Sequence, residues 1–162
     1  MNTITGNILD IHVGIICHQV SAQYVMGAGL AKQIAQKYPI VKRAYLEERP
    51  TLGTMQIVNV AHDLWVANLV GQEKIGRGEV QTNYPALTNA IKAAARIARI
   101  SEKQIYFPYM MGCGLAGGDW EIVSEIISRC SPDAIIVRLS DTRAPRTLRS
   151  KEVIKRDQQA QA

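Results

Sequence analysis

The sequence contains little cysteine, and none of it lies in a pattern that binds metal or builds a disulfide framework. Its three cysteines, Cys17, Cys113 and Cys130, are odd in number and far apart, and no CxxC pair occurs. This spacing indicates neither a zinc site nor a set of structural disulfides. We therefore expect a reducing, cytoplasmic setting.

Two further absences narrow the class of protein. No apolar run reaches the length of a membrane-spanning helix, and the N-terminus lacks the basic start and apolar core of a signal peptide. The three histidines, His12, His18 and His62, do not have the spacing of metal ligands. We expect no membrane partner, no metal and no cofactor.

Positive charge is concentrated at the C-terminal end. The 162 residues have a net charge of +5, and residues 141–162 hold six basic against three acidic side chains, which is +3 of that total. Hydrophobic periodicity also fades there, so we expect one domain over residues 1–140 and a basic tail over residues 141–162. A solvated or helical appendage is favoured over a tail that contacts nucleic acid or an acidic partner.

Hydrophobic patterns predict strands that alternate with helices. Residues 13–20 form a nearly continuous apolar run, which is typical of a strand buried on both faces. Residues 61–63 are expected to form the turn of a hairpin between the third and fourth strands. The other predicted strands are 3–5, 55–60, 64–70, 104–109 and 133–139, and the predicted helices are 30–38, 41–48, 84–100 and 120–130. This order predicts an α/β fold with a central mixed sheet covered by helices on both faces.

Two glycine-rich loops each follow a predicted strand and precede a predicted helix. The first contains Gly27 and Gly29, and the second has four glycines within residues 112–118. Glycine lets the backbone approach a ligand closely, and free N–H groups at the start of a helix attract anions. The pair is suited to clamp a pyrophosphate, although the first loop taken alone is more typical of a tight turn without a ligand. Neither loop matches GxGxxG or GxxxxGK[ST], which disfavours a dinucleotide dehydrogenase and a kinase-type NTPase.

At these loops the sequence resembles the macro domain family. The matching stretches are GNIL (6–9), ICHQVSAQYVMGAGLAKQI (16–34), ANLVGQ (67–72), TNYPAL (82–87) and FPYMMGCGLAGGDWEIV (107–123). The branch that it resembles most consists of bacterial and phage proteins described as ADP-ribose-1''-phosphate phosphatase-like, alongside the terminal ADP-ribose glycohydrolases. The resemblance implies a three-layer α/β/α fold and a cleft for ADP-ribose.

The resemblance also implies which residues bind this ligand. Asn7, followed by Ile8, falls where many macro domains have an aspartate that binds the adenine amino group, and asparagine keeps the carbonyl acceptor but loses the charge. The first loop matches the one beside the distal ribose and pyrophosphate, and the second matches the one that wraps the phosphates. The residues in question are Gly27, Ala28, Gly29 and Leu30 in the first loop, and Gly112, Cys113, Gly114, Leu115, Ala116 and Gly117 in the second.

Three positions depart from the family's pattern. Ser21 stands where many relatives have an asparagine that touches the distal ribose. Gln72 and Ala116 stand where the related glycohydrolases have a lysine and an aspartate. The chemistry of that lysine and aspartate is therefore not expected, which favours phosphatase-like or binding-only behaviour.

Asp119 and His18 are the candidates for catalysis. Asp119 lies beside the second loop, where a carboxylate can act as a general base or cap the helix that follows. His18 ends a buried strand and is either a general acid near the ribose or a core histidine. Gln23 and Gln72 either offer amide groups to the ribose or phosphate or lie in surface loops. Cys113 is expected to pack in its loop rather than to react.

Three functions are consistent with this pattern. The favoured one is a metal-independent phosphatase that converts ADP-ribose-1''-phosphate to ADP-ribose and phosphate. The second is a non-catalytic reader or scavenger of ADP-ribose. The third, which Gln72 and Ala116 disfavour, is a hydrolase that removes ADP-ribose from modified protein or nucleic acid.

Overall fold

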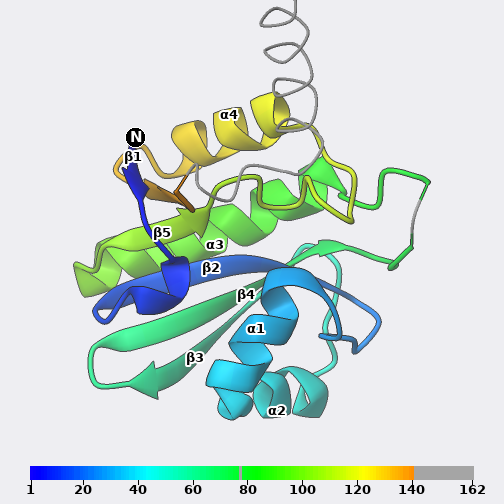
Figure 1. The fold of residues 1–162 in the computed structure, drawn as a ribbon, viewed down its shortest axis with the longest axis horizontal. Helices are drawn as coiled ribbons and strands as arrows, with labels where there is room; N and C mark the ends of the chain where they lie inside the picture. Colours follow the sequence, from blue (N-terminus) through cyan, green and yellow to red (C-terminus); the bar gives the residue numbers. More distant parts are fainter. Residues whose placement is uncertain (77, 141–162) are drawn as a thin grey trace, which may run out of the picture.

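The computed structural model describes residues 1–76 and 78–140, which form a three-layer α/β/α structure around a six-stranded sheet (Figure 1). The strand order is β1-β6-β5-β2-β4-β3, and every neighbouring pair is parallel except β3 and β4. The strands are β1 (Asn2–Thr5), β2 (Gly14–Ser21), β3 (Met55–Ala61), β4 (Leu64–Gln72), β5 (Ile105–Pro108) and β6 (Ile135–Arg138). The predicted mixed α/β fold is confirmed. The predicted tail over residues 141–162 lies outside the described residues.

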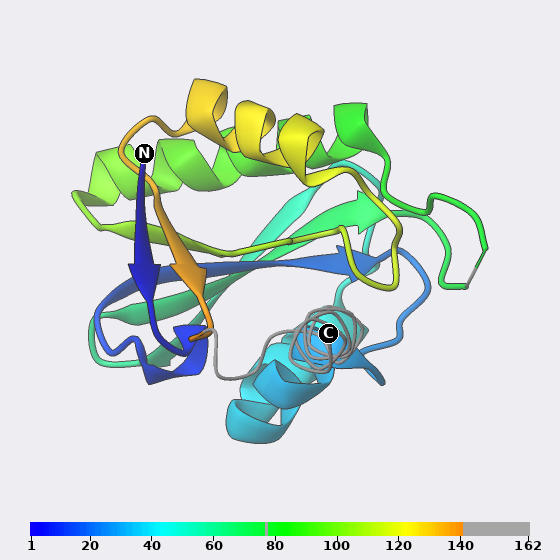
Figure 2. The ribbon, with the colours of Figure 1, turned by 45° about the horizontal axis from the view of Figure 1, so that its top comes forward.

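The helices cover the two faces of the sheet in pairs. They are α1 (Gly29–Lys37), α2 (Pro39–Glu47), α3 (Tyr84–Ser101) and α4 (Trp120–Cys130), with a short 3-10 helix, η1 (Ile8–Asp10), after β1. Helices α1 and α2 lie on one side of the sheet, and α3 and α4 lie on the other (Figures 1 and 2). Each predicted helix is present at nearly its predicted position, whereas η1 was not predicted.

The central strands alternate their side chains between two hydrophobic cores. In β2, Ile15 and Cys17 pack in the core beneath α3 and α4, while Ile16 and Val20 pack in the core beneath α1 and α2. All four side chains are at most 2% exposed. A strand with helices on both faces must be apolar at successive positions, which explains the continuous run in the sequence.

The loops that follow the parallel strands all lie at one edge of the sheet, because five strands run in the same direction. Residues 6–7 follow β1, residues 22–28 follow β2, residues 73–83 follow β4, and residues 109–119 follow β5. Both glycine-rich loops are therefore at the carboxyl ends of neighbouring strands, where open α/β sheets bind ligands. None of the helices in the described ranges is both long and apolar enough to span a membrane.

Strand β4 contains one more residue than β2 near this edge. Val20 pairs with Val70, but Ser21 pairs with Gln72, so that Gly71 is the extra residue of a β-bulge. A bulge shifts the alternation of side chains by one position. Gln72 can therefore reach Gln19, which lies on the face covered by α3.

Candidate functional site

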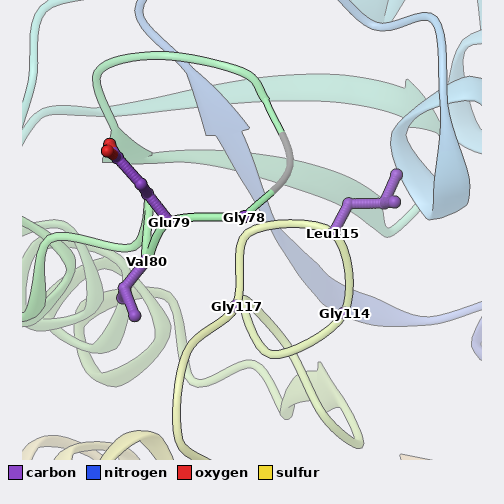
Figure 3. A pocket seen from close by; sticks show the side chains of 6 residues that line it. All are labelled: Gly78, Glu79, Val80, Gly114, Leu115 and Gly117. Atoms are coloured by element: carbon purple, nitrogen blue, oxygen red, sulfur yellow. The ribbon is translucent and has the colours of Figure 1, made fainter.

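A cleft lies between the second glycine-rich loop and the segment that leads into α3. Its volume is about 390 Å³, and its lining residues are Gly78, Glu79, Val80, Gly114, Leu115 and Gly117. Figure 3 shows the two segments side by side, with Leu115 and Glu79 pointing in different directions. The walls nearest each other are therefore formed largely by backbone.

Residues 112–118, which we call the phosphate loop, hold backbone N–H groups that have no partner within the described part of the chain. The N–H of Gly117 bonds to the carbonyl of Gly114 (3.1 Å), and the N–H of Gly118 bonds to the carbonyl of Gly112 (2.9 Å). The N–H groups of Gly114, Leu115 and Ala116 donate to no described residue. Successive free N–H groups in a turn form a concave site for an anion.

The start of α1 is a second source of free donors at the same edge. Its capping residue, Ala28, provides no side-chain hydrogen bond, whereas α3 and α4 are capped by the side chains of Asn83 and Asp119. The first N–H groups of an uncapped helix have no partner within it and attract negative charge. Gly29 takes a φ of +57°, a conformation that favours glycine. The predicted ligand loops thus both offer backbone donors.

The cleft is held together by contacts that the sequence did not predict. The carbonyl of Ala116 accepts from the N–H groups of Gln81 (2.8 Å) and Thr82 (3.2 Å), and the Thr82 hydroxyl donates to the carbonyl of Gly112 (2.6 Å). Thr82 is 5% exposed. Thr82 lies in the TNYPAL stretch, which the resemblance had singled out. Nothing in the sequence showed that its hydroxyl would bond to the carbonyl of Gly112.

The loop between β2 and α1 is fixed by Ser21 and Gln23. The buried Ser21 hydroxyl accepts from the N–H of Gln23 (3.3 Å), and the Tyr45 hydroxyl donates to the Ser21 carbonyl (2.5 Å). The Gln23 side-chain oxygen accepts from the N–H of Ile75 (3.1 Å), which connects this loop to the one after β4. Both residues were predicted to bind ligand, and the structure gives each a bond within the protein.

Gln72 is likewise engaged within the protein. Its side-chain oxygen accepts from Gln19 (2.9 Å), and its side-chain nitrogen donates to the carbonyl of Lys74 (2.9 Å). These bonds hold the amide at the end of β4 and leave fewer of its groups for a ligand.

Asn7 and Ile8 lie after β1, at the far end of this edge of the sheet. The Asn7 side-chain oxygen accepts from the N–H of Leu9 (2.9 Å) and so caps η1. An amide oxygen has two lone pairs, so one remains for a ligand donor. The Ile8 side chain is 5% exposed and packs in the core beneath α1 and α2.

Asp119 caps α4, which is one of the two roles that the sequence predicted for it. One carboxylate oxygen accepts from the N–H of Glu121 (2.9 Å), and the Asp119 side chain is exposed to solvent. The neighbouring Cys113 has its pKa raised to about 11, first by burial and then by the negative charge of Asp119. This thiol stays protonated near neutral pH, which supports packing over reactivity.

His18 is buried in the middle of β2. It is 1% exposed, and its Nε2 lies 2.5 Å from the side-chain oxygen of Asn68. Burial lowers the pKa of His18 to about 4, and the bond to Asn68 opposes this shift. These observations favour the core histidine over the general acid, and we assign no catalytic role to His18.

We expect the stability of the protein to fall as the pH drops from about 6.5 towards 4, because of His18. The unfolded chain binds this proton with a pKa near 6.5 and the folded chain with a pKa of about 4. Protonation therefore favours unfolding in this window, by about 3 kcal/mol in full, and contributes nothing above it. Urea unfolding at pH 7 and pH 4.5 should show a smaller pH dependence for His18→Gln than for the wild type. Equal dependences would show that His18 is not the group responsible.

Several solved structures share this fold. A protein of unknown function from Bacteroides thetaiotaomicron is 29% identical over 86% of this chain and 97% of its own, with a TM-score of 0.77. A macrodomain protein from Streptomyces coelicolor is 24% identical over 86% of this chain and 97% of its own, with a TM-score of 0.71. No model of a protein family and no curated protein sequence matches the chain.

These neighbours define the class: the chain has the macrodomain fold, as its glycine-rich motifs implied. One of the solved structures that share this fold is DarTG from Thermosipho africanus in complex with ADP-ribose. It is 15% identical over 90% of this chain and 43% of its own, with a TM-score of 0.69. The resemblance to the phosphatase-like branch stays a prediction.

Proposed function

We propose that this chain binds ADP-ribose or ADP-ribose-1''-phosphate, with the pyrophosphate against the phosphate loop, in the cleft that this loop forms with residues 78–80. The start of α1 lies at the same edge of the sheet but does not line this cleft. The observation that carries the proposal is the run of free N–H groups at Gly114, Leu115 and Ala116 beside a cleft of about 390 Å³. A pyrophosphate offers several acceptors to such donors and carries the charge that the helix start attracts. The ADP-ribose complex of DarTG, which shares this fold over 43% of its chain, supports this ligand.

The spacing of the strands suits a ligand of this shape. Asn7 follows β1, and the phosphate loop and the start of α1 follow β5 and β2, which are two and three places along the sheet. Neighbouring strands are about 4.8 Å apart, so these positions are separated by about 10–14 Å. An extended nucleotide can place adenine near Asn7 and its phosphates beside the phosphate loop.

Calorimetric titration with ADP-ribose tests this proposal. We expect a single site with micromolar affinity, and weaker binding of AMP, which lacks the second phosphate and the distal ribose. If neither ligand binds at millimolar concentration, the cleft serves a different anion and the proposal is wrong.

We further propose that the protein hydrolyses ADP-ribose-1''-phosphate, with Asp119 orienting the attacking water. Water adds to the phosphorus, the bond between phosphorus and the 1''-oxygen breaks, and that oxygen takes a proton to give ADP-ribose and inorganic phosphate. The free N–H groups of the phosphate loop are placed to stabilise the charge on the transferred phosphate. Asp119 is an exposed carboxylate beside this loop, near enough to Cys113 to raise the pKa of its thiol.

Variants of Asp119 should separate catalysis from capping. Asparagine also caps helices well, so Asp119→Asn should stay within about 0.5 kcal/mol of the wild-type stability, whereas Asp119→Ala should lose about 1 kcal/mol. If Asp119 orients water, both variants should release phosphate about a hundredfold more slowly than the wild type. Wild-type release rates in Asp119→Asn would assign the residue to capping alone.

Binding without hydrolysis is the second function that the geometry supports. One carboxylate oxygen of Asp119 already accepts from the N–H of Glu121 at the start of α4, and His18 is buried and bonded to Asn68. A wild-type protein that binds ADP-ribose but releases no phosphate would act as a reader or scavenger.

A further inference from the structure

A partly buried network of side chains connects the phosphate loop to strands β2 and β4. The side-chain nitrogen of Gln19, on β2, donates to the Gln72 side-chain oxygen (2.9 Å) at the end of β4 and to the Thr82 hydroxyl (3.0 Å). The Thr82 hydroxyl in turn donates to the carbonyl of Gly112 (2.6 Å), the first residue of the phosphate loop. The partners of Gln19 are 53 and 63 residues away in the sequence.

The direction of each bond in this network is determined by its neighbours. The Thr82 hydroxyl has a single hydrogen, which it donates to Gly112, so it must accept from Gln19. Gln72 uses its nitrogen to donate to Lys74, so its oxygen also accepts from Gln19. The Gln19 amide therefore has one orientation, which leaves its buried oxygen without a partner in the described structure. An unsatisfied buried oxygen is costly, which indicates that the position of the nitrogen matters.

The Gln19 side chain lies close to two glycines, and a larger residue at either would require its amide to move. A Cβ atom at Gly71 or at Gly112 would lie 2.7 Å from the Gln19 side-chain oxygen. Gly112 also has a φ of +73°, which disfavours any other residue there. The amide thus fills the gap between the bulge of β4 and the first residue of the phosphate loop.

We propose that Gln19 and Thr82 are positioning residues that hold the phosphate loop in its anion-binding conformation. The Gly112 carbonyl accepts from the N–H of Gly118, which closes the loop on itself, and from the Thr82 hydroxyl, which connects the loop to the segment before α3. The free N–H groups of Gly114, Leu115 and Ala116 lie between these ends, so their direction depends on where Gly112 is held. This inference rests on the proposed binding of ADP-ribose.

Two substitutions of Thr82 test the role of its hydroxyl. Thr82→Val keeps the shape of the side chain and removes the hydroxyl, so it should weaken ADP-ribose binding roughly tenfold. Thr82→Ser keeps the hydroxyl and removes a methyl group, so it should bind within about twofold of the wild type. If Thr82 acted only through packing, Thr82→Val would bind ADP-ribose more tightly than Thr82→Ser, because valine fills the space better than serine does. The matched control is Thr88→Val on α3, which loses a hydroxyl bond to the carbonyl of Tyr84 and should keep wild-type affinity.

A double-mutant cycle with Gln19→Met tests whether the two residues act together. If Gln19 and Thr82 both act through the Gly112 carbonyl, the double variant should bind ADP-ribose no more weakly than the single variant with the lower affinity. Independent, multiplicative losses would overturn the proposal, as would wild-type affinity in Thr82→Val.

Amide hydrogen exchange tests the positioning role even if ADP-ribose does not bind. In the ligand-free protein, Thr82→Val should speed exchange of the Gly117 and Gly118 N–H groups about tenfold, and Thr82→Ser and Thr88→Val should not. A wild type without affinity for ADP-ribose would contradict the proposed function alone. Unchanged exchange in Thr82→Val would contradict the positioning role alone.

Discussion

A Gly114→Val variant is expected to fold like the wild type and to lose ADP-ribose affinity by about a hundredfold or more, which is about 3 kcal/mol. A Cβ atom built at Gly114 meets no atom within 4 Å, so the protein itself has room for a side chain. Gly114 is also one of the residues that line the cleft, where the ligand is proposed to bind. The variant should therefore be measured by calorimetry with ADP-ribose and by thermal unfolding, and only the first should change.

The matched control is Gly76→Val in the loop after β4. Gly76 does not line the cleft, and the nearest atom to its Cβ position is the Gln81 side-chain nitrogen at 3.6 Å. This variant should bind ADP-ribose as the wild type does. Unchanged affinity in Gly114→Val would show that the ligand does not approach this part of the phosphate loop. Because φ at Gly114 is not in the positive range, the expected loss of affinity in Gly114→Val would come from contact with the proposed ligand and not from backbone strain.

The second expected result concerns stability and not affinity. Gly14→Ala should lower the free energy of unfolding by about 2–4 kcal/mol and leave the ADP-ribose affinity of the folded protein unchanged. Gly14 begins β2 with a φ of +119°, and a Cβ atom there would lie 2.5 Å from the carbonyl oxygen of Gln104. The same oxygen accepts from the N–H of Ile15 (2.9 Å), so moving it would disturb the pairing of β2 with β5. Strained backbone and overpacking each cost about 1–3 kcal/mol.

Urea unfolding of Gly14→Ala measures this loss, and Gly6→Ala is its control. A Cβ atom at Gly6 meets nothing within 4 Å, so that variant should stay within about 0.5 kcal/mol of the wild type. Equal stabilities of the two variants would contradict the clash at Gly14. Calorimetry under folding conditions should give Gly14→Ala the wild-type affinity, because Gly14 lies at the amino end of β2, away from the cleft.

The fold could be predicted from the sequence where the signal is local. The run over residues 13–20 is apolar at successive positions because β2 has a helix layer on each face, and the structure places it at Gly14–Ser21. Asp119 was anticipated as a helix cap, because aspartate is favoured at that position whatever its other roles. The turn between β3 and β4 was also predicted from residues close together in the sequence. Asp63 in this turn takes a left-handed φ of +57°, which aspartate tolerates.

The parts that could not be predicted depend on distant contacts. Nothing near Gln19 in the sequence shows that its amide meets Thr82, because the two residues come together only when β2 and β4 are paired. His18 was left open between two roles, and the contact with Asn68 that favours one of them spans 50 residues. The assignments of the two loops to phosphate and ribose stay predictions, which the variants above test.

The extra residue at Gly71 has a consequence for comparing related sequences. A relative whose fourth strand lacked this residue would align well with β4 up to Val70, yet the next side chain would point to the opposite face of the sheet. In that relative, the residue in the spatial position of Gln72 would differ from the one that a gap-free alignment pairs with Gln72. Alignments across this strand should therefore be anchored on the glycine, so that insertions and deletions of one residue are treated as changes of side-chain direction.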